Sequence, residues 1–237
     1  MAYPTVSAPY GLKPITLIGG QVFAGATRQL AIANTAGTGY NTNIFYGDVV
    51  KLASDGTIQV DTGTTTATPV GVFLGCQYIS AVTGQLTFSQ YYPASLAVKS
   101  GSTIFAFVAD DPDQLFKAVL VAGTTADDTT SGLLPTYLGR TMIGSNAQLV
   151  QNAGSTVTGD SKVGIYTAAG GTTTASLPIR IVDVVPDTAN SSGNFVEVIV
   201  KWNAPYVVST STSSGGITTT TASVVTGGHQ YLNPTGV

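Results

Sequence analysis

Charged side chains are scarce in this chain. Asp, Glu, Lys and Arg make up 9% of its 237 residues, against about 25% in an average soluble protein, and Glu197 is the only glutamate. Long helices of soluble proteins carry Glu, Lys and Arg on the face exposed to water, and this sequence has too few to cover several such helices. Thr and Val, which favour strands, are abundant. The composition therefore predicts an all-β fold.

Basic residues, cysteine and histidine are also few. Nine Lys and Arg side chains in a chain of net charge -3 offer no basic stripe for a phosphate backbone, so direct binding to nucleic acid is not expected. Cys76 is the single cysteine and lies in an apolar run, which predicts a buried, inert thiol. His229, the single histidine, follows a Gly-rich segment, where nothing would hold it rigidly enough for a catalytic triad.

No other pattern of residues carries recognisable chemistry. Cys and His pairs with zinc spacing are absent, and the Gly-rich stretches lack the strand and helix context of a phosphate-binding loop. Five aspartates might supply oxygen ligands for calcium, but we interpret them as solvated acidic turns: Asp110, Asp111, Asp113, Asp127 and Asp128. The expectation is a protein that is not an enzyme, holds no metal or cofactor and works by assembling with other subunits.

The sequence also lacks the signals of export and membrane insertion. Residues 1–5 have neither the basic nor the apolar region of a signal peptide. No apolar run reaches the ~18 residues that a membrane-spanning helix needs. We therefore expect synthesis in the cytoplasm and no membrane contact.

What the sequence does contain is a series of short strand candidates separated by turn residues. Between Asp48–Leu52 and Thr57–Val60, the dipeptide Asp55-Gly56 predicts a tight hairpin. Further strands are expected at 29–33, 70–74, 77–81, 85–90, 104–109, 115–121, 162–166, 177–185 and 195–202. Residues 133–143 fit a short helix or a strand. The predicted organisation is an arm at 1–20, β subdomains at 21–100 and 101–206, and a tail at 207–237.

The two ends of the chain are predicted to be the partner-binding elements. Prolines favour extended backbone in the arm, although a strand capping the domain's own sheet is the alternative. The Thr-, Ser- and Gly-rich composition of 209–228 predicts disorder in the absence of a partner. The candidate binding residues in the arm are Tyr3, Pro4, Val6, Pro9, Tyr10, Leu12 and Pro14, and those in the tail are Ile217, Val224, Val225, Tyr231 and Leu232.

Three stretches resemble a known family. Residues 47–52, 54–57 and 69–73 together resemble the β-tulip pattern of head decoration (capsid cement) proteins of tailed bacteriophages. Residues 10–14 and 109–116 are similar to virion structural proteins of marine tailed phages. The resemblance implies a β-tulip, barrel-like or sandwich body that sits on the capsid surface of the virion. It implies binding to the major capsid protein, often as a homotrimer, with arms that add a strand to capsid sheets.

Two other functions fit the same sequence features. Another virion β protein, such as a tail-tube, fibre or spike subunit, would share the charge-poor strands and the long Thr-rich tail. A carbohydrate-binding β-sandwich module would need Asn, Asp and aromatic residues clustered on one set of loops. Tyr91 and Tyr92 could stack on a sugar, but core filling and subunit contact are the more usual roles of tyrosine.

Overall fold

The computed structural model describes residues 6–33, 40–124, 142–167, 174–188, 195–204, 206–214 and 217–232, with side chains omitted from 206–226. The structure is all-β, with 41% strand, and its described residues contain no α-helix. The sheets do not close into a barrel, and the arrangement is consistent with a β sandwich. The prediction of an all-β fold is confirmed. Residues 133–141 of the segment that fitted a helix or a strand lie outside the described residues.

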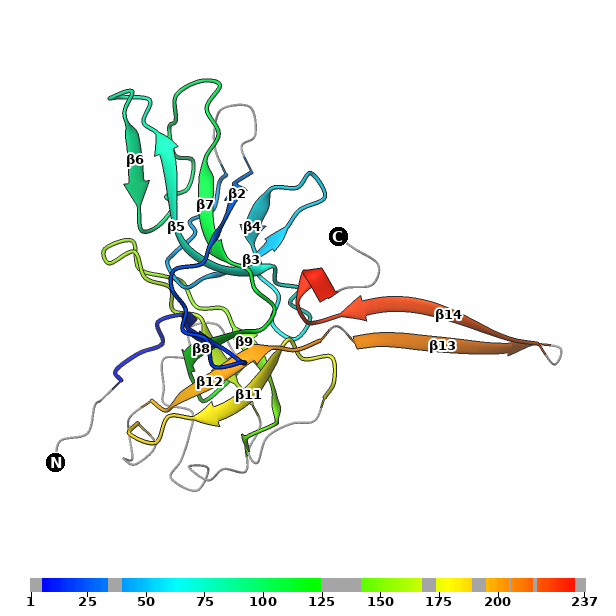
Figure 1. Cartoon of the computed structure of the whole chain (residues 1–237). Helices are drawn as coiled ribbons and strands as arrows, with labels where there is room; N and C mark the ends of the chain where they lie inside the picture. Colours follow the sequence, from blue (N-terminus) through cyan, green and yellow to red (C-terminus); the bar gives the residue numbers. More distant parts are fainter. Residues whose placement is uncertain are drawn as a thin grey trace.

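Two antiparallel sheets of six strands each form the body (Figure 1). The lower sheet has the order β1 (Lys13–Leu17), β8 (Gln114–Val119), β12 (Glu197–Trp202), β11 (Ile179–Val184), β9 (Asn146–Val150) and β10 (Gly164–Tyr166). The upper sheet has the order β2 (Arg28–Ala31), β7 (Phe105–Ala109), β5 (Gly71–Ile79), β3 (Val49–Leu52) and β4 (Ile58–Val60), and β6 (Leu86–Ser89) pairs with β5.

The β3–β4 hairpin forms where Asp55-Gly56 predicts it. Gly56 adopts a φ of 78°, which is the left-handed region that glycine enters without a steric penalty. The Asp55 carboxylate accepts hydrogen bonds from the Thr57 backbone N–H and from its hydroxyl, at 3.0 and 2.6 Å. The turn therefore sets the register in which Val50 faces Val60.

A continuous apolar core joins the two sheets. Val49 and Val72 of the upper sheet belong to the same buried cluster as Phe116 and Trp202 of the lower sheet. The strand predicted at 195–202 forms as β12, and its alternate residues Val198, Val200 and Trp202 are all buried. A second buried cluster, which includes Phe73, Tyr92 and Ile104, consists only of residues from the upper sheet and its connecting loops.

The sheets divide the chain at a different place from the predicted subdomains. Strand β7 lies after residue 100 but pairs with β2 and β5 in the upper sheet. The crossing to the lower sheet occurs in the turn at 110–113, between β7 and β8. The chain therefore passes between the sheets about ten residues after the predicted subdomain boundary at residue 100, because the turn at 110–113 joins strands of different sheets.

The first strand corrects the prediction of a free arm over 1–20. Strand β1 pairs with β8, with Lys13 opposite Lys117 and Pro14 opposite Phe116. Leu12, just before it, is fully buried in the shared core. Proline is tolerated because β1 is an edge strand, where alternate N–H groups point away from the sheet. The alternative interpretation, a strand of the domain's own sheet, holds for these residues.

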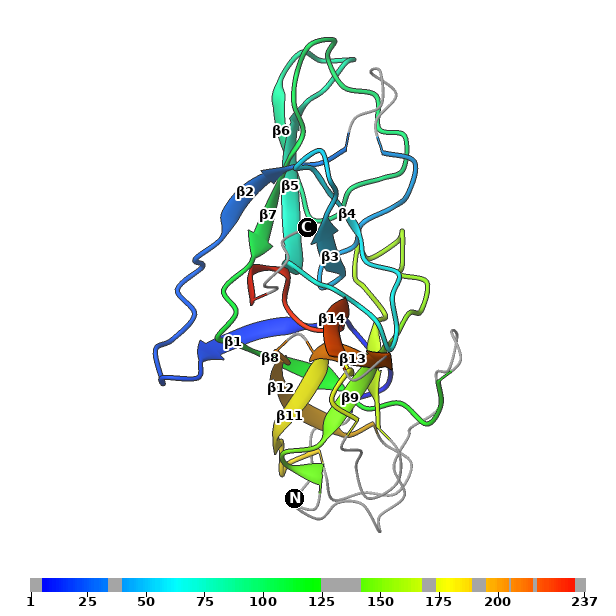
Figure 2. The ribbon, with the colours of Figure 1, turned by 90° about the vertical axis from the view of Figure 1, so that its right-hand side faces the viewer.

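The tail forms a long hairpin rather than a free chain. Strands β13 (Tyr206–Ser214) and β14 (Ile217–Thr226) pair antiparallel, from Tyr206 opposite Thr226 to Ser214 opposite Ile217. Figure 1 shows the hairpin extending away from the body, with no other described strand beside it, and in Figure 2 it points toward the viewer. A short 3-10 turn, η3 (Gln230–Leu232), follows and returns to the body. The prediction of a disordered tail is wrong for the backbone of these strands.

Candidate interaction elements

The N-terminal segment is fixed to the body by a charged cluster around Tyr10. The Tyr10 hydroxyl donates a hydrogen bond to the buried carboxylate of Glu197, which also pairs with Lys117 at 2.9 Å. The Lys13 and Lys117 ammonium groups lie 4.5 and 5.7 Å from the centre of the Tyr10 ring. Burial, with the neighbouring Glu197 acting in the same direction, raises the pKa of Tyr10 far above its ordinary value. Tyr10 is therefore an anchor within the chain.

The other residues predicted to bind through the arm fall into three groups. Leu12 and Pro14 belong to the core and to β1, as described above. Pro9 is buried, and Val6 packs against a small cluster that contains Phe195, whose N–H bonds to the Val6 carbonyl. Tyr3 and Pro4 lie outside the described residues. The predicted arm residues that the structure describes, from Val6 to Pro14, are thus all attached to the body.

Residues 227–232, which we call the C-terminal latch, follow β14 directly and hold the base of the hairpin against both sheets. The Gln230 side chain accepts a hydrogen bond from the Leu52 N–H at 2.7 Å and donates one to the Leu52 carbonyl at 3.2 Å. The Gln230 N–H bonds to the Pro69 carbonyl, and the His229 N–H bonds to the Asn203 carbonyl. These bonds give β3 on the upper sheet a partner supplied by the tail.

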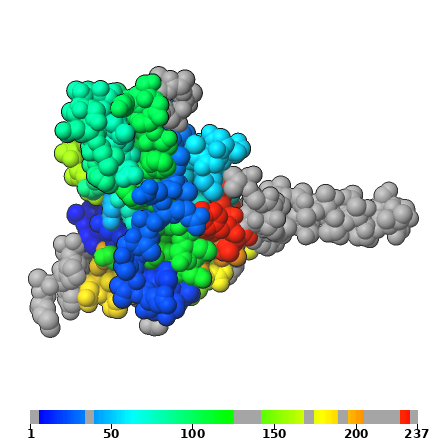
Figure 3. Space-filling model, turned by 45° about the horizontal axis from the view of Figure 1, so that its top comes forward, coloured from blue at the N-terminus to red at the C-terminus, as the bar shows by residue number. Residues whose placement is uncertain are grey.

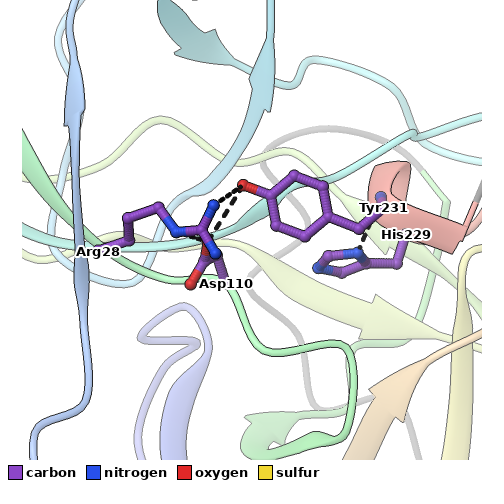
Figure 4. Close-up of polar contacts among 4 residues, drawn as sticks. All are labelled: Arg28, Asp110, His229 and Tyr231. Carbon is purple, nitrogen blue, oxygen red and sulfur yellow. Dashed lines mark hydrogen bonds and ion pairs between the residues drawn. The ribbon is translucent and has the colours of Figure 1, made fainter. Parts of the chain in front are cut away.

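An ion pair on the body holds Tyr231 of the latch (Figure 4). Arg28 and Asp110 are 2.9 Å apart, and the Tyr231 hydroxyl donates to Asp110 at 3.1 Å and accepts from Arg28 at 3.3 Å. The Arg28 guanidinium also lies 5.2 Å from the Tyr231 ring centre. Tyr231 therefore makes its contacts within the chain. Leu232, the neighbouring residue that was also predicted to bind a partner, is 46% exposed.

His229 is the buried centre of the latch. It is fully buried, and its ring lies 6.3 Å from that of Trp202 and 5.3 Å from that of Tyr231. Its Nδ1 accepts the Tyr231 N–H at 3.3 Å, while its Nε2 has no partner of hydrogen-bonding geometry among the residues that the structure describes. Burial lowers the pKa of His229 to about 4, although nearby carbonyls of Val70 and Asp110 act in the opposite direction. The expectation of a loosely held histidine is therefore wrong.

The latch is expected to weaken in acid. The unfolded chain binds a proton at His229 near pH 6.5, whereas the folded chain resists protonation down to about pH 4. As the pH falls from 6.5 to 4, the reluctance of folded His229 to bind a proton should lower the free energy of unfolding by roughly 3 kcal/mol, since each unit of pKa difference corresponds to ~1.4 kcal/mol. Buried Asp48 opposes this, because burial raises its pKa to about 6 and favours the folded state as pH falls.

The measurement must therefore compare variants. We expect the stability difference between wild type and His229→Gln, measured by urea unfolding, to shrink as pH falls from 7 to 4. Asp48→Asn serves as the control for the opposing carboxyl. Parallel pH profiles for wild type and His229→Gln would contradict the buried neutral histidine.

Cys76, Asp48 and Gln151 are candidate reactive groups away from the latch, and each is buried or hydrogen-bonded within the chain. Burial raises the pKa of the Cys76 thiol to about 12. A pocket beside Asp48 contains Gln151, whose amide donates to the carbonyls of Asp61 and Gly63, and Asp48 itself accepts the Phe45 N–H. No group of three or more His, Cys, Asp or Glu side chains gathers within the described ranges.

The acidic turn is occupied by protein contacts. Asp110 pairs with Arg28, Asp111 accepts the Asp113 N–H, and Asp113 lies 3.6 Å from Lys201. Asp127 and Asp128 fall outside the described residues. In the parts of the chain that the structure covers, no helix is both long and apolar enough to cross a membrane.

Comparison with known proteins identifies no relative. No family model, no curated protein and no solved structure matches this chain. The hairpin, the latch and the N-terminal end are therefore interpreted from their own geometry.

Proposed function

We propose that this protein is a structural component of a virion, a decoration protein that stabilises a tailed-phage head by binding the major capsid protein and other copies of itself, as a homotrimer. The observation that carries the proposal is the hairpin β13–β14, which reaches beyond the body while the latch and Asn203 fix its base. Because no other described strand lies beside the hairpin, another molecule would have to supply the groups that pair with it or pack against it.

The physical properties of the hairpin suit this role. An isolated two-stranded hairpin is marginally stable in water, and both of its edges expose unpaired backbone groups. Packing against a neighbouring subunit would bury those groups and stabilise the hairpin. Repeated over many copies on a shell, weak contacts of this kind add up through avidity.

The capsid contact is assigned to the N-terminal end. The described segment from Val6 onward is attached to the body, so the residues before it, with Tyr3 and Pro4, can lie on another protein. An extended segment that adds to a strand edge gains main-chain hydrogen bonds there. This retains the predicted role of the arm but limits it to residues before Val6.

The test removes that end alone. Deleting residues 2–5 should leave a folded protein, because no described core or strand contact is removed. The same deletion should reduce occupancy at least tenfold when the protein is added to heads stripped of it, since the arm's main-chain bonds are lost. Val157→Asp, a change at a 94% exposed side chain, is the matched control and should bind normally. Equal occupancy by the truncated and full-length proteins would refute the assignment.

A further inference from the structure

The upper sheet carries an apolar face that no described part of the chain covers. Strand pairing places Ile79 opposite Leu86, and Gln77 opposite both Phe88 and Phe105, so these side chains share one face. Phe107, two residues beyond Phe105, joins them, and its ring stacks on Phe88 at 6.3 Å. The opposite face contributes Cys76, Ala106 and Val108 to the core. We call the first set the outer face.

The exposure of the outer face is unusual for an antiparallel sheet. Leu86 and Phe88 are 57% and 65% exposed, and Val82 in the adjoining turn is 91% exposed. Strands β5, β6 and β7 and the turn at 80–85 contain no charged residue. Figure 3 shows that the region formed by these strands reaches the surface of the body. A solvated sheet face normally bears polar side chains, so an apolar one indicates an interface.

The hairpin is a separate two-stranded sheet that pairs with no other described strand, and its composition matches that of the outer face. Residues 206–226 include no charged residue, and their apolar members are concentrated near the base: Tyr206, Val207, Val208, Val224 and Val225. With strands of nine and ten residues, the hairpin is about 30 Å long at ~3.3 Å per residue. That length exceeds what the outer face requires, since β6 and β7 span four and five residues.

We propose that the hairpin β13–β14 of one copy packs on the outer face of a second copy. Within one chain the hairpin extends from the side of the body opposite β6, so it does not cover its own outer face (Figure 1). Packing two uncharged surfaces together desolvates no ion, whereas a charged partner surface would leave its charges unpaired against either one. The occupant that fits both features is therefore this chain itself.

The contact joins two different surfaces, so it is heterologous. Contacts of that type close into a ring when the rotation between copies allows it. The inference rests on the self-association included in the proposed function, and it identifies the surfaces that carry it. It is tested without particles, so a failure to bind capsids does not affect the outcome.

Mixing two complementary variants tests the proposal. Phe88→Asp disables the outer face, and replacing residues 209–222 by Asn-Gly shortens the hairpin while keeping Val207 opposite Val225. By light scattering, wild type should be oligomeric, and each variant alone should fall to the mass of one chain, which is 24.1 kDa for Phe88→Asp and slightly less for the shortened protein. An equimolar mixture should form a dimer, because one variant retains the hairpin and the other retains the outer face.

Several outcomes would overturn the proposal. A monomeric wild type, an oligomeric Phe88→Asp protein, or a mixture that stays monomeric would each do so. If the shortened hairpin alone left the oligomer intact, the outer faces would instead be meeting each other. Leu86→Lys provides a second outer-face variant, and Val157→Asp a surface control that should remain oligomeric. Circular dichroism confirms that each protein is folded.

Discussion

Replacing Leu12 by alanine is expected to lower the free energy of unfolding by about 3 kcal/mol, the usual cost of removing a fully buried leucine side chain. Leu12 is fully buried in the core shared by both sheets, and its N–H bonds to the Gly47 carbonyl at 3.0 Å. Urea unfolding followed by the fluorescence of Trp202, the single tryptophan, measures the change because Trp202 lies in the same core.

The same experiment decides whether the N-terminal segment is part of the body. Val157→Ala, at an exposed site, is the control and should leave the unfolding curve unchanged. Deleting residues 1–14 should prevent folding, because it removes Leu12, the Tyr10–Glu197 contact and the start of β1. Wild-type stability in Leu12→Ala would show that the segment is a detachable arm.

Replacing Gly227 by valine is expected to release the C-terminal latch. Gly227 has a φ of +70°, and a Cβ placed there would lie 2.0 Å from the Ser176 carbonyl oxygen, a distance that no packing adjustment of a side chain relieves. Backbone strain of this kind costs ~1–3 kcal/mol before the steric clash is added. The Gln230–Leu52 bonds and the burial of His229 should be lost together.

Nuclear magnetic resonance can follow that release directly. The pKa of His229 should rise from about 4 toward its ordinary value of 6.5, and the Leu52 amide should exchange faster. Gly84→Val is the matched control, because Gly84 has a similar φ of +68° but open space around it. Gly84→Val should leave the His229 pKa and the exchange of the Leu52 amide unchanged. An unchanged His229 pKa in Gly227→Val would contradict the role of Gly227 in seating the latch.

The strands of the body could be predicted because their signals are local. Alternation in 195–202, the apolar run at 70–74 and the Asp55-Gly56 turn each depend on neighbours in sequence. Strand β1 was predicted only as the alternative to a free arm, because Pro14 reads as a break, and only the fold shows that it occupies an edge. The crossing between the sheets at 110–113 was missed for a similar reason, since a turn looks the same whether or not it changes sheets.

The hairpin in the tail was not predicted, because the prediction of disorder used the overall composition of 209–228 and overlooked the turn signal within it. Gly215 and Gly216 separate two Thr- and Ser-rich runs, and a two-glycine linker between strand-forming residues is a hairpin signal. The latch had no such signal. Its contacts join Tyr231 to Arg28 and Asp110, which are 203 and 121 residues away in the chain.

The outer face shows a further limit of sequence patterns. The period-two spacing of Leu86 with Phe88, and of Phe105 with Phe107, predicts strands with one apolar face. Whether that face meets the core or the solvent depends on what the fold places over it. Here Tyr78, Cys76 and Ala106 fill the core side, so the phenylalanines remain outside.

The central claim, that this protein decorates a tailed-phage head, is tested most directly by cryo-electron microscopy of the intact particle. We expect density for the two-sheet body on the outer surface of the head, with the residues before Val6 against the major capsid protein and each hairpin against a neighbouring copy. Density for the body in the tail or inside the head, or its absence from the particle, would contradict the account.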